Sequence, residues 1–261
     1  MWLDDRMTLA RRAATEGSRR ARMLKDRSPT NWRKGDGSVV SAADIDTERA
    51  VRSLLLQECP HDAVLGEEDG LSGQSRDSCW IVDPIDGTTN YLSGMPIWAT
   101  MVAWVEEGIT QCAAISAPEL DAEWHAVKHG GSFKNGNPIS VTDHTTLRNA
   151  RMSVGGWHEY SDAGLKFLAQ LTDDADFAWG IGNFWAHALV AEGCLELGLS
   201  VGTNIWDTLA PALLVEEAGG MAGSIVKSET RPTSTLMTGT PGVWREALFL
   251  AGDSSDTYMS D

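Results

Sequence analysis

The chain has 261 residues, of which 42% are hydrophobic and 22% are charged, so its composition is that of a globular protein with a sizeable core rather than of a disordered chain. The formal net charge is −16. Because a nucleic-acid-binding surface must neutralise phosphates with Lys and Arg, this balance argues against nucleic acid as a partner.

The first part of the chain predicts two helices separated by a loop or hairpin. Residues 2–25 place Leu, Met and Ala at helical spacing, and residues 43–57 have a second apolar stripe. Residues 28–40, with one proline and two glycines, predict the loop or hairpin between them. The Arg and Lys residues of 6–34 are interpreted as a solvated helix face, with a rim that attracts an anionic substrate as the alternative.

The middle of the chain predicts strands. Residues 79–82 form a short apolar run typical of a buried strand. Residues 97–105 and 110–117 are rich in β-formers and suggest a hairpin, and residues 123–141 repeat this style around an Asn-Gly turn signal.

The second half predicts mixed helices and strands. We expect helices at 161–171 and 184–194, a strand at 195–201, and a third helix from near Trp206 to a Gly-Gly pair. Pro211 is expected to fall in the first turn or so of this last helix, where proline is tolerated.

Domain and compartment follow from the same features. We expect one compact unit made of an N-terminal half, residues 1–150, and a C-terminal half, residues 151–261.

Residues 1–24 alternate charged and apolar groups, which excludes a signal peptide, and no run of about 18 apolar residues predicts a membrane span. The four cysteines form no CxxC pair and indicate free thiols in a reducing compartment, so the expected location is the cytoplasm.

Three carboxylate clusters are the candidate chemistry of the chain. Each has a simple structural explanation when taken singly, since an acidic run between glycines is usually a solvated turn and an Asp before an apolar helix is usually an N-cap. The clusters are Gly66-Glu67-Glu68-Asp69-Gly70, Asp83-Pro84-Ile85-Asp86-Gly87-Thr88-Thr89-Asn90, and Trp206-Asp207.

The second cluster favours a binding site. A buried strand ends at Asp83, and Asp86 follows three residues later, across a proline. If a helix begins after Gly87, the backbone N–H groups of this turn form an anion site. Carboxylates beside an anion repel it unless cations lie between them, and Mg²⁺ prefers carboxylate, carbonyl and phosphate oxygens. The segment therefore predicts a metal and a phosphate together.

These residues resemble the signatures of the inositol monophosphatase superfamily. The run from Trp80 to Tyr91 is similar to its central motif, Gly66-Glu67-Glu68 to its upstream metal motif, and the segment from Trp206 to Gly220 to its C-terminal signature. Asp44 and Glu48, which follow the loop Gly35-Asp36-Gly37-Ser38, resemble an early helix of the family. Residues 115–118 and 182–193 resemble, less specifically, the bacterial histidinol-phosphatase branch.

The resemblance implies a metal centre and a fold. It implies that Glu67, Asp83 and the Ile85 carbonyl hold one Mg²⁺, and that Asp83, Asp86 and Asp207 hold a second. A third, weaker ion is implied near Glu67, which therefore counts among the catalytic residues. The implied fold class is α/β (α+β), a layered α-β-α-β-α sandwich of the inositol monophosphatase and fructose-1,6-bisphosphatase type, assembled as a homodimer.

The resemblance also implies roles in hydrolysis. Thr88, paired with Asp44, orients the attacking water and takes its proton, and the backbone N–H groups of Gly87 and Thr88 hold phosphate oxygens. Glu68 is expected either to support the metal ligands or to point to solvent.

Substrate contacts are implied at Asp86, Asn183, Ser200 and Asp207. The family commonly has an acidic residue where this chain has Ser200, and histidinol-phosphatases tend to have Asp where it has Asn183. Glu192, Glu196 or His187 could compensate for the missing acids, but the sequence does not show which way these side chains face.

We therefore expect a Mg²⁺-dependent phosphatase acting on a small soluble phosphate monoester, with L-histidinol phosphate as the first candidate. Inositol 1-phosphate or another polyol or sugar phosphate is the alternative. A bisphosphate nucleotidase of the same superfamily is a weaker alternative. The alternative from a different functional class is a non-catalytic protein that binds metal or phosphate at a relic site.

Overall fold

The structure is a computed structural model. It describes residues 2–25, 27, 30–35, 37–73, 78–157, 160, 162–224 and 234–252. Asp36 of the glycine-rich loop and the expected helix start at residue 161 lie outside these residues. The chain forms two compact units, one of Met1–Lys128 with Phe133–Gly136 and one of His129–Ser132 with Asn137–Asp261. The division near residue 150 stays a prediction.

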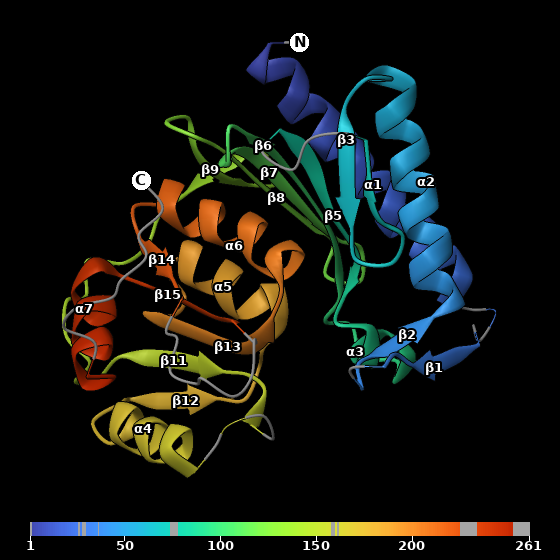
Figure 1. Ribbon diagram of the computed structural model, residues 1–261. Coiled ribbons are helices and arrows are strands. Elements are labelled where there is room, and N and C mark those ends of the chain that lie inside the picture. Colours follow the sequence, from blue (N-terminus) through green and yellow to red (C-terminus); the bar gives the residue numbers. More distant parts are fainter. Residues whose placement is uncertain are drawn as a thin grey trace. The chain divides into compact units, whose positions relative to one another are not determined.

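The first unit begins with the two predicted helices and the hairpin between them (Figure 1). Helix α1 spans Leu3–Lys25 and α2 spans Ala42–Glu58, and the antiparallel strands β1 (Asn31–Arg33) and β2 (Val39–Ser41) form the hairpin. Acidic residues in the first turn of α1 and basic residues in its last turn match the helix dipole.

An eight-stranded sheet follows, with the strand order β10-β9-β8-β7-β6-β5-β3-β4. The predicted hairpin of β6 and β7 is present, and the predicted buried strand is β5, buried along its whole length. The strands of this sheet and the short helix α3 span β3 Ala63–Gly66, β4 Gly70–Ser72, β5 Cys79–Asp86, α3 Thr88–Leu92, β6 Ala99–Glu106, β7 Ile109–Ala117, β8 Ala122–Val127, β9 Gly131–Lys134 and β10 Asn137–Ile139.

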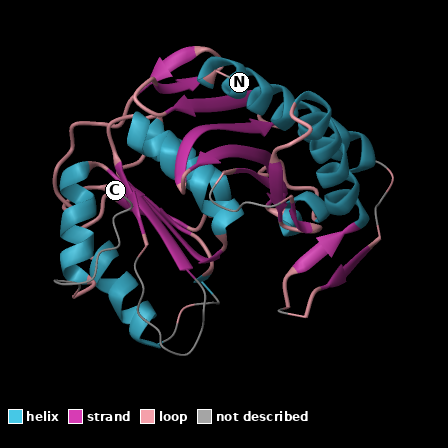
Figure 2. Cartoon of the chain, turned by 45° about the horizontal axis from the view of Figure 1, so that its top comes forward, coloured by secondary structure: helices cyan, strands magenta, loops and turns pink. Residues whose placement is uncertain are grey.

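The two long helices pack on this sheet. Helix α1 contacts β6, β7 and α2, and α2 contacts β5, so the apolar stripes predicted from the sequence face a strand layer (Figure 2). Small residues of α1, such as Ala10 and Ala14, pack there beside Val82, Val102 and other buried apolar groups. Burial of this kind stabilises the unit by about 25 cal/mol per Å² of apolar surface.

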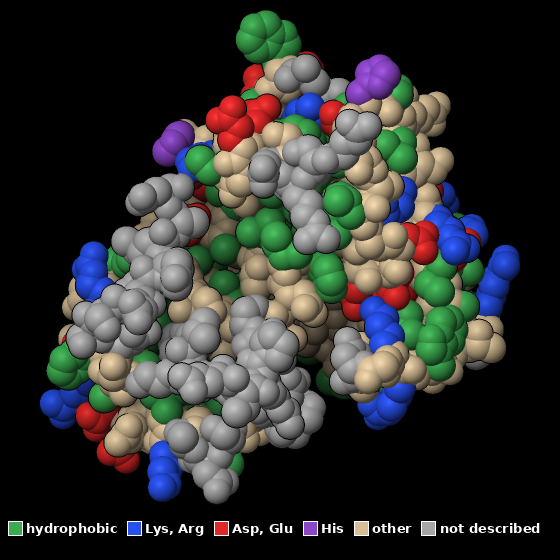
Figure 3. All heavy atoms as spheres, viewed as in Figure 1, with side chains coloured by type: hydrophobic (Ala, Val, Ile, Leu, Met, Phe, Trp, Pro, Cys, Tyr) green, Lys and Arg blue, Asp and Glu red, His purple; other side chains and the backbone are tan. Residues whose placement is uncertain are grey.

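The basic residues of α1 contact acidic groups. Arg11 pairs with Glu123 at 2.5 Å, and Arg12 pairs with Glu58 at 3.0 Å. On the face drawn in Figure 3, Lys and Arg side chains lie interspersed with Asp and Glu side chains. These pairs favour the interpretation of this segment as a solvated helix face.

The second unit contains the predicted helices α4 (Asp162–Thr172), α5 (Asn183–Ala191) and α6 (Ile205–Glu217), and the predicted strand β13 (Leu197–Thr203). They belong to a five-stranded sheet of order β12-β11-β13-β15-β14. Helix α5 packs against α6 and β13, whereas α4 packs against α7, which also contacts β15. The elements of this unit that the sequence did not predict are β11 Arg151–Val154, β12 Phe177–Trp179, β14 Met221–Gly223, β15 Ser234–Gly239 and α7 Pro241–Leu250.

The expected place of Pro211 was wrong. Helix α6 begins at Ile205, so Pro211 lies in the helix interior rather than in the first turn. Proline has no N–H to donate to the carbonyl of Asp207, four residues earlier, which normally costs helix stability. Pro211 is buried, and this apolar contact offsets part of that cost.

The expectation of a mixed α/β fold is confirmed. None of the described helices has both the length and the apolar character that crossing a bilayer demands.

Candidate active site

The first feature of the site is a bulge in β5 that holds two carboxylates. Asp83 faces Met101 of β6 and Asp86 faces Ala99, so three steps along β5 match two along its partner. In a regular strand, residues three apart point to opposite faces, and one extra residue returns them to the same face. Pro84 lies in this bulge, where it has no ladder N–H to lose, and its carbonyl accepts from Thr100 at 2.7 Å.

Both carboxylates are buried. Asp83 is 1% exposed and Asp86 is 6% exposed. A buried carboxylate needs a compensating charge or hydrogen bonds to remain ionised. The local backbone therefore concentrates two carboxyl groups at the end of one strand.

A left-handed glycine turns the chain from β5 into α3. Gly87 has φ 86°, a conformation that glycine adopts without strain, and α3 begins at the next residue. The Gly87 carbonyl accepts from the Tyr91 N–H at 2.9 Å. The predicted buried strand and turn are therefore present, and the helix on which the anion site was conditional exists, with 5 residues.

The hydroxyl of Thr88 contacts Asp44, as the sequence resemblance implied. Its Oγ1 donates to Asp44 Oδ1 at 2.9 Å and lies 3.1 Å from the Ile85 carbonyl. A threonine hydroxyl has one hydrogen and two lone pairs. When that hydrogen is donated to Asp44, the Thr88 oxygen can still accept a hydrogen bond from water.

Asp44 is held in place by the start of α2. Its Oδ2 accepts from the Ser41 N–H at 2.8 Å and from the Ser41 hydroxyl at 2.6 Å. Burial raises the pKa of Asp44, whereas the hydrogen bonds from Ser41 and Thr88 lower it, and the net direction is upward. Asp44 is thus an immobile acceptor that orients the Thr88 hydroxyl.

Glu67 lies beside Asp83 because two neighbouring strands are parallel. Strand β3 pairs with β5 in the register Gly66 to Val82, and Glu67 N–H donates to the Val82 carbonyl at 3.3 Å. The carboxyl ends of parallel strands meet at one edge of a sheet. The first and second carboxylate clusters are therefore neighbours within the first unit.

A buried ion pair supports the loop that carries Glu67. The Glu48 carboxylate accepts from the backbone N–H groups of Glu68 and Asp69 at 2.7 and 3.0 Å. Arg52 binds Glu48 at 2.7 Å and also binds the Gly70 carbonyl. A Cβ at Gly66 would collide with the Glu48 carboxylate, which explains the glycine in this motif.

Glu68 does not point to solvent. Its side chain is 7% exposed, and its Oε1 accepts from Lys34 Nζ at 2.7 Å. The same ammonium lies 2.8 Å from Glu67 Oε1. Of the two expectations for Glu68, the solvent-facing one was therefore wrong.

In the second unit, Asp207 lies in the first turn of α6. Its Oδ2 accepts from the Asn204 N–H at 2.5 Å, as in a capping box. The N-cap of α6 is Asn204, so the expectation that Asp207 is the N-cap was wrong; Asp207 is the third residue of the helix and closes the capping box, and any metal ligation by Asp207 is an additional role.

Asn183 and Ser200 also belong to the second unit. Asn183 begins α5 with φ 61°, a left-handed conformation that Asn tolerates better than most residues. The Ser200 hydroxyl lies on β13, 3.0 Å from His187 Nε2, and His187 Nδ1 lies 2.8 Å from the Thr238 hydroxyl. Burial lowers the pKa of His187 to about 3, so its ring is neutral at pH 7.

Two of the three replacements considered for the missing acids already have structural partners. His187 is neutral and hydrogen-bonded on both ring nitrogens. Glu196 is buried against Arg151, and it also accepts from the Thr142 hydroxyl at 3.2 Å. Burial raises the pKa of Glu196, but the contacts with Arg151 and Thr142 outweigh it, so the pKa is lowered.

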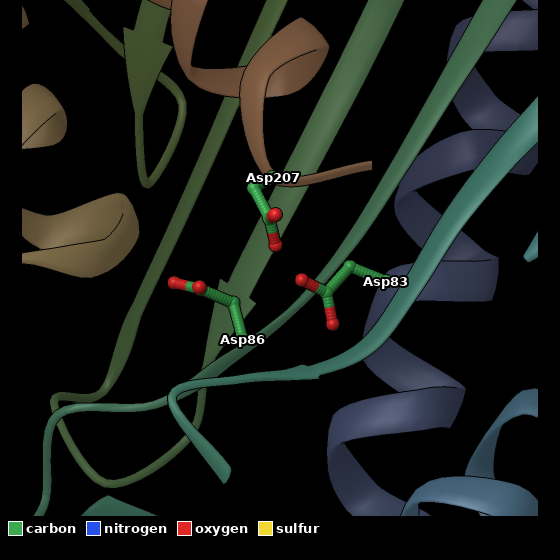
Figure 4. A group of neighbouring side chains, drawn as sticks. All are labelled: Asp83, Asp86 and Asp207. Carbon is green, nitrogen blue, oxygen red and sulfur yellow. The ribbon is translucent and has the colours of Figure 1, made fainter. Parts of the chain in front are cut away.

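The acidic residues fit a divalent metal by their chemistry. Asp83 and Asp86 of the first unit and Asp207 of the second, drawn in Figure 4, each offer a carboxylate oxygen that could serve as a metal ligand. Asp83 and Asp86 come from the end of β5, and Asp207 comes from the start of α6. Carboxylate oxygens are ligands for hard cations such as Mg²⁺, whereas soft metals prefer thiolates.

Comparison with known proteins identifies the class. The sequence model of the inositol monophosphatase family matches residues 3–249. A histidinol-phosphatase of Mycobacterium tuberculosis is 35% identical over 199 residues, which cover 74% of this chain and 76% of that protein. An inositol monophosphatase of Dictyostelium discoideum is 32% identical over 197 residues, covering 72% of each.

The fold agrees with this class. The crystal structure of the extragenic suppressor protein suhB from Bartonella henselae has a TM-score of 0.85 and 24% identity, and the match covers 95% of this chain and 99% of that one. The chain therefore belongs to the inositol monophosphatase family. It is a phosphatase of this metal-dependent family, and the prediction of an inositol monophosphatase-type α/β fold is confirmed.

The sequence did not predict the roles of three residues that shape the site. Lys34, Glu48 and Arg52 all contact the loop of Glu67, directly or through one another. The sequence resemblance includes Glu48 in a motif but implies no role for it. A buried Glu and Arg four residues apart on one helix are a detectable signal for an ion pair, but only the structure shows the loop that they hold.

Proposed function

We propose that this phosphatase uses Mg²⁺ to hydrolyse a small soluble phosphate monoester. The observation that carries the proposal is the β5 bulge, which brings two buried carboxylates to one face of the strand just before α3 begins. Glu67, Asp83, Asp86, Asp207 and the Ile85 carbonyl are the proposed ligands of two to three ions. Bound Mg²⁺ would neutralise phosphate charge and lower the pKa of water.

The chain's own residues would position the reactants. The Thr88 hydroxyl, oriented by its hydrogen bond to Asp44, accepts a hydrogen bond from the attacking water and fixes its direction. When the water gives that proton to the Thr88 oxygen, the Thr88 hydroxyl proton passes to Asp44. The backbone N–H groups of Gly87 and Thr88 hold phosphate oxygens at the turn. Substrate contacts are proposed at Asp86, Asn183, Ser200 and Asp207, and we propose a cytoplasmic homodimer.

L-Histidinol phosphate is the first candidate substrate. The support is the resemblance of residues 115–118 and 182–193 to histidinol-phosphatases, together with the relative of that name at 35% identity. A neutral polyol phosphate is the second candidate. It is supported by the neutral Ser200 and His187, and by Glu196, whose charge is already balanced by Arg151.

Ser200→Glu tests the substrate through charge. The ammonium group of histidinol phosphate would gain a carboxylate partner, and a hydrogen bond to a charged group is worth roughly 1.5–3 kcal/mol. We expect kcat/KM for histidinol phosphate, relative to inositol 1-phosphate, to rise roughly 10- to 100-fold. Steady-state phosphate release with both substrates measures this ratio.

Ser200→Gln is the matched control, because it has the size of Glu without the charge. Equal shifts in the two variants would show that size rather than charge is responsible. A wild type that already prefers histidinol phosphate strongly, with no gain in Ser200→Glu, would contradict the charge argument and favour the resemblance.

A further inference from the structure

The ammonium of Lys34 lies between two carboxylates at the proposed metal site. Its Nζ contacts Glu67 Oε1 at 2.8 Å and Glu68 Oε1 at 2.7 Å. The three side chains are 22%, 17% and 7% exposed, so water screens these ion pairs only in part. Glu67 is a proposed metal ligand, whereas Glu68 has no assigned role.

The backbone fixes where Lys34 begins. The turn between β1 and β2 is closed by hydrogen bonds from Lys34 N–H to the Ser38 carbonyl at 2.8 Å and from Gly37 N–H to the Lys34 carbonyl at 3.0 Å. Burial lowers the pKa of Lys34, but the hydrogen bonds to Glu67 and Glu68 raise this pKa by more than burial lowers it, so the net direction is upward. The side chain is therefore a permanent cation that reaches the acidic loop from a closed turn.

The acidic loop is fixed from its other side. Glu48 holds the backbone N–H groups of Glu68 and Asp69, so the two carboxylates that face Lys34 start from a rigid support. An ammonium on the Glu67 carboxylate repels a divalent cation that approaches the same oxygens. A metal ion at Glu67 must therefore displace the Lys34 ammonium, and Glu68 offers the displaced ammonium an alternative partner.

We propose that Lys34 is an internal cation that competes with Mg²⁺ for the Glu67 carboxylate and withdraws onto Glu68 when the ion binds. This inference rests on the metal site of the proposed function. According to this inference, Lys34 sets the concentration at which Mg²⁺ binds to Glu67, and Glu68 retains the displaced ammonium.

Isothermal titration of the EDTA-treated protein with MgCl₂ tests the competition without measuring turnover. Lys34→Met removes the charge and keeps an unbranched side chain. We expect its Kd for the weakest Mg²⁺ site to be roughly three- to tenfold tighter than that of the wild type. Lys34→Arg keeps the cation and should bind Mg²⁺ with nearly the wild-type Kd.

Arg49→Met is the matched control for net charge. Arg49 is a neighbouring cation that pairs with Asp69 at 3.3 Å and contacts neither proposed partner of Lys34. The Arg49→Met variant should leave the Kd for Mg²⁺ unchanged. If Lys34→Met binds Mg²⁺ no more tightly than the wild type, or only as tightly as Arg49→Met, the competition is wrong and the proposed function stands. If the wild type binds no Mg²⁺, both are overturned.

Discussion

Asp86→Asn is expected to abolish turnover while leaving the fold intact. The substitution removes one carboxylate from the β5 bulge without changing side-chain size. Because Asp86 is only 6% exposed, bulk water cannot easily take the place of the lost metal ligand. We expect kcat to fall by roughly 10³-fold or more, the upper range for losing a group that stabilises charge. Phosphate release at saturating Mg²⁺ measures the loss.

Asp69→Asn is the matched control for this variant. Asp69 belongs to the nearby acidic loop, but it pairs with Arg49 rather than facing the bulge. It should retain nearly full activity, and circular dichroism should show both variants folded. Near wild-type kcat in Asp86→Asn would remove Asp86 from the proposed metal ligands.

Thr88→Ala is expected to lower kcat by roughly 10²–10⁴-fold, the range for losing a positioned proton-transfer group. The variant removes the hydroxyl that donates to Asp44 at 2.9 Å and leaves the α3 backbone unchanged. KM should change little, because the proposed backbone N–H contacts to phosphate remain. Initial rates over a range of substrate concentrations separate kcat from KM.

Two further substitutions make this result specific. Thr88→Ser restores a hydroxyl on the same carbon and should recover most of the activity. Thr89→Ala removes the adjacent hydroxyl, which is exposed, and should have little effect. A loss below about tenfold in Thr88→Ala would exclude Thr88 from the reaction.

Local patterns predicted most elements of the fold. Apolar stripes identified α1 and α2, and the β6–β7 hairpin lies where two β-rich runs flank Glu107 and Gly108. The strand–turn–helix around Asp83 was predicted for the same reason, because a buried run, a proline and a glycine each restrict the backbone locally.

What the sequence could not predict depends on pairing between distant segments. The bulge that returns Asp83 and Asp86 to one face exists only in the register of β5 against β6. The contact of Lys34 with Glu67 and Glu68 joins segments more than 30 residues apart. The expected place of Pro211 was wrong because this residue lies beyond the first turn of a helix that begins at Ile205.

The second unit was predicted less completely. Strand β12 has three residues, and β14 and β15 lie in a region without a clear period-2 pattern. The partners of Ser200 also depend on tertiary packing, because His187 lies on α5 and Thr238 on β15. No local pattern could show that the ring between them is buried and neutral.

Metal-dependent phosphate release tests the central claim most directly. The purified protein is treated exhaustively with EDTA and assayed on histidinol phosphate, inositol 1-phosphate, fructose 1,6-bisphosphate and 3′-phosphoadenosine 5′-phosphate, with and without added Mg²⁺. We predict that at least one monoester is hydrolysed only when Mg²⁺ is restored, and that excess Ca²⁺ inhibits, because its longer bonds and looser geometry do not fit an octahedral Mg²⁺ site. Full activity after EDTA treatment, or no release from any substrate with Mg²⁺ present, would contradict the account.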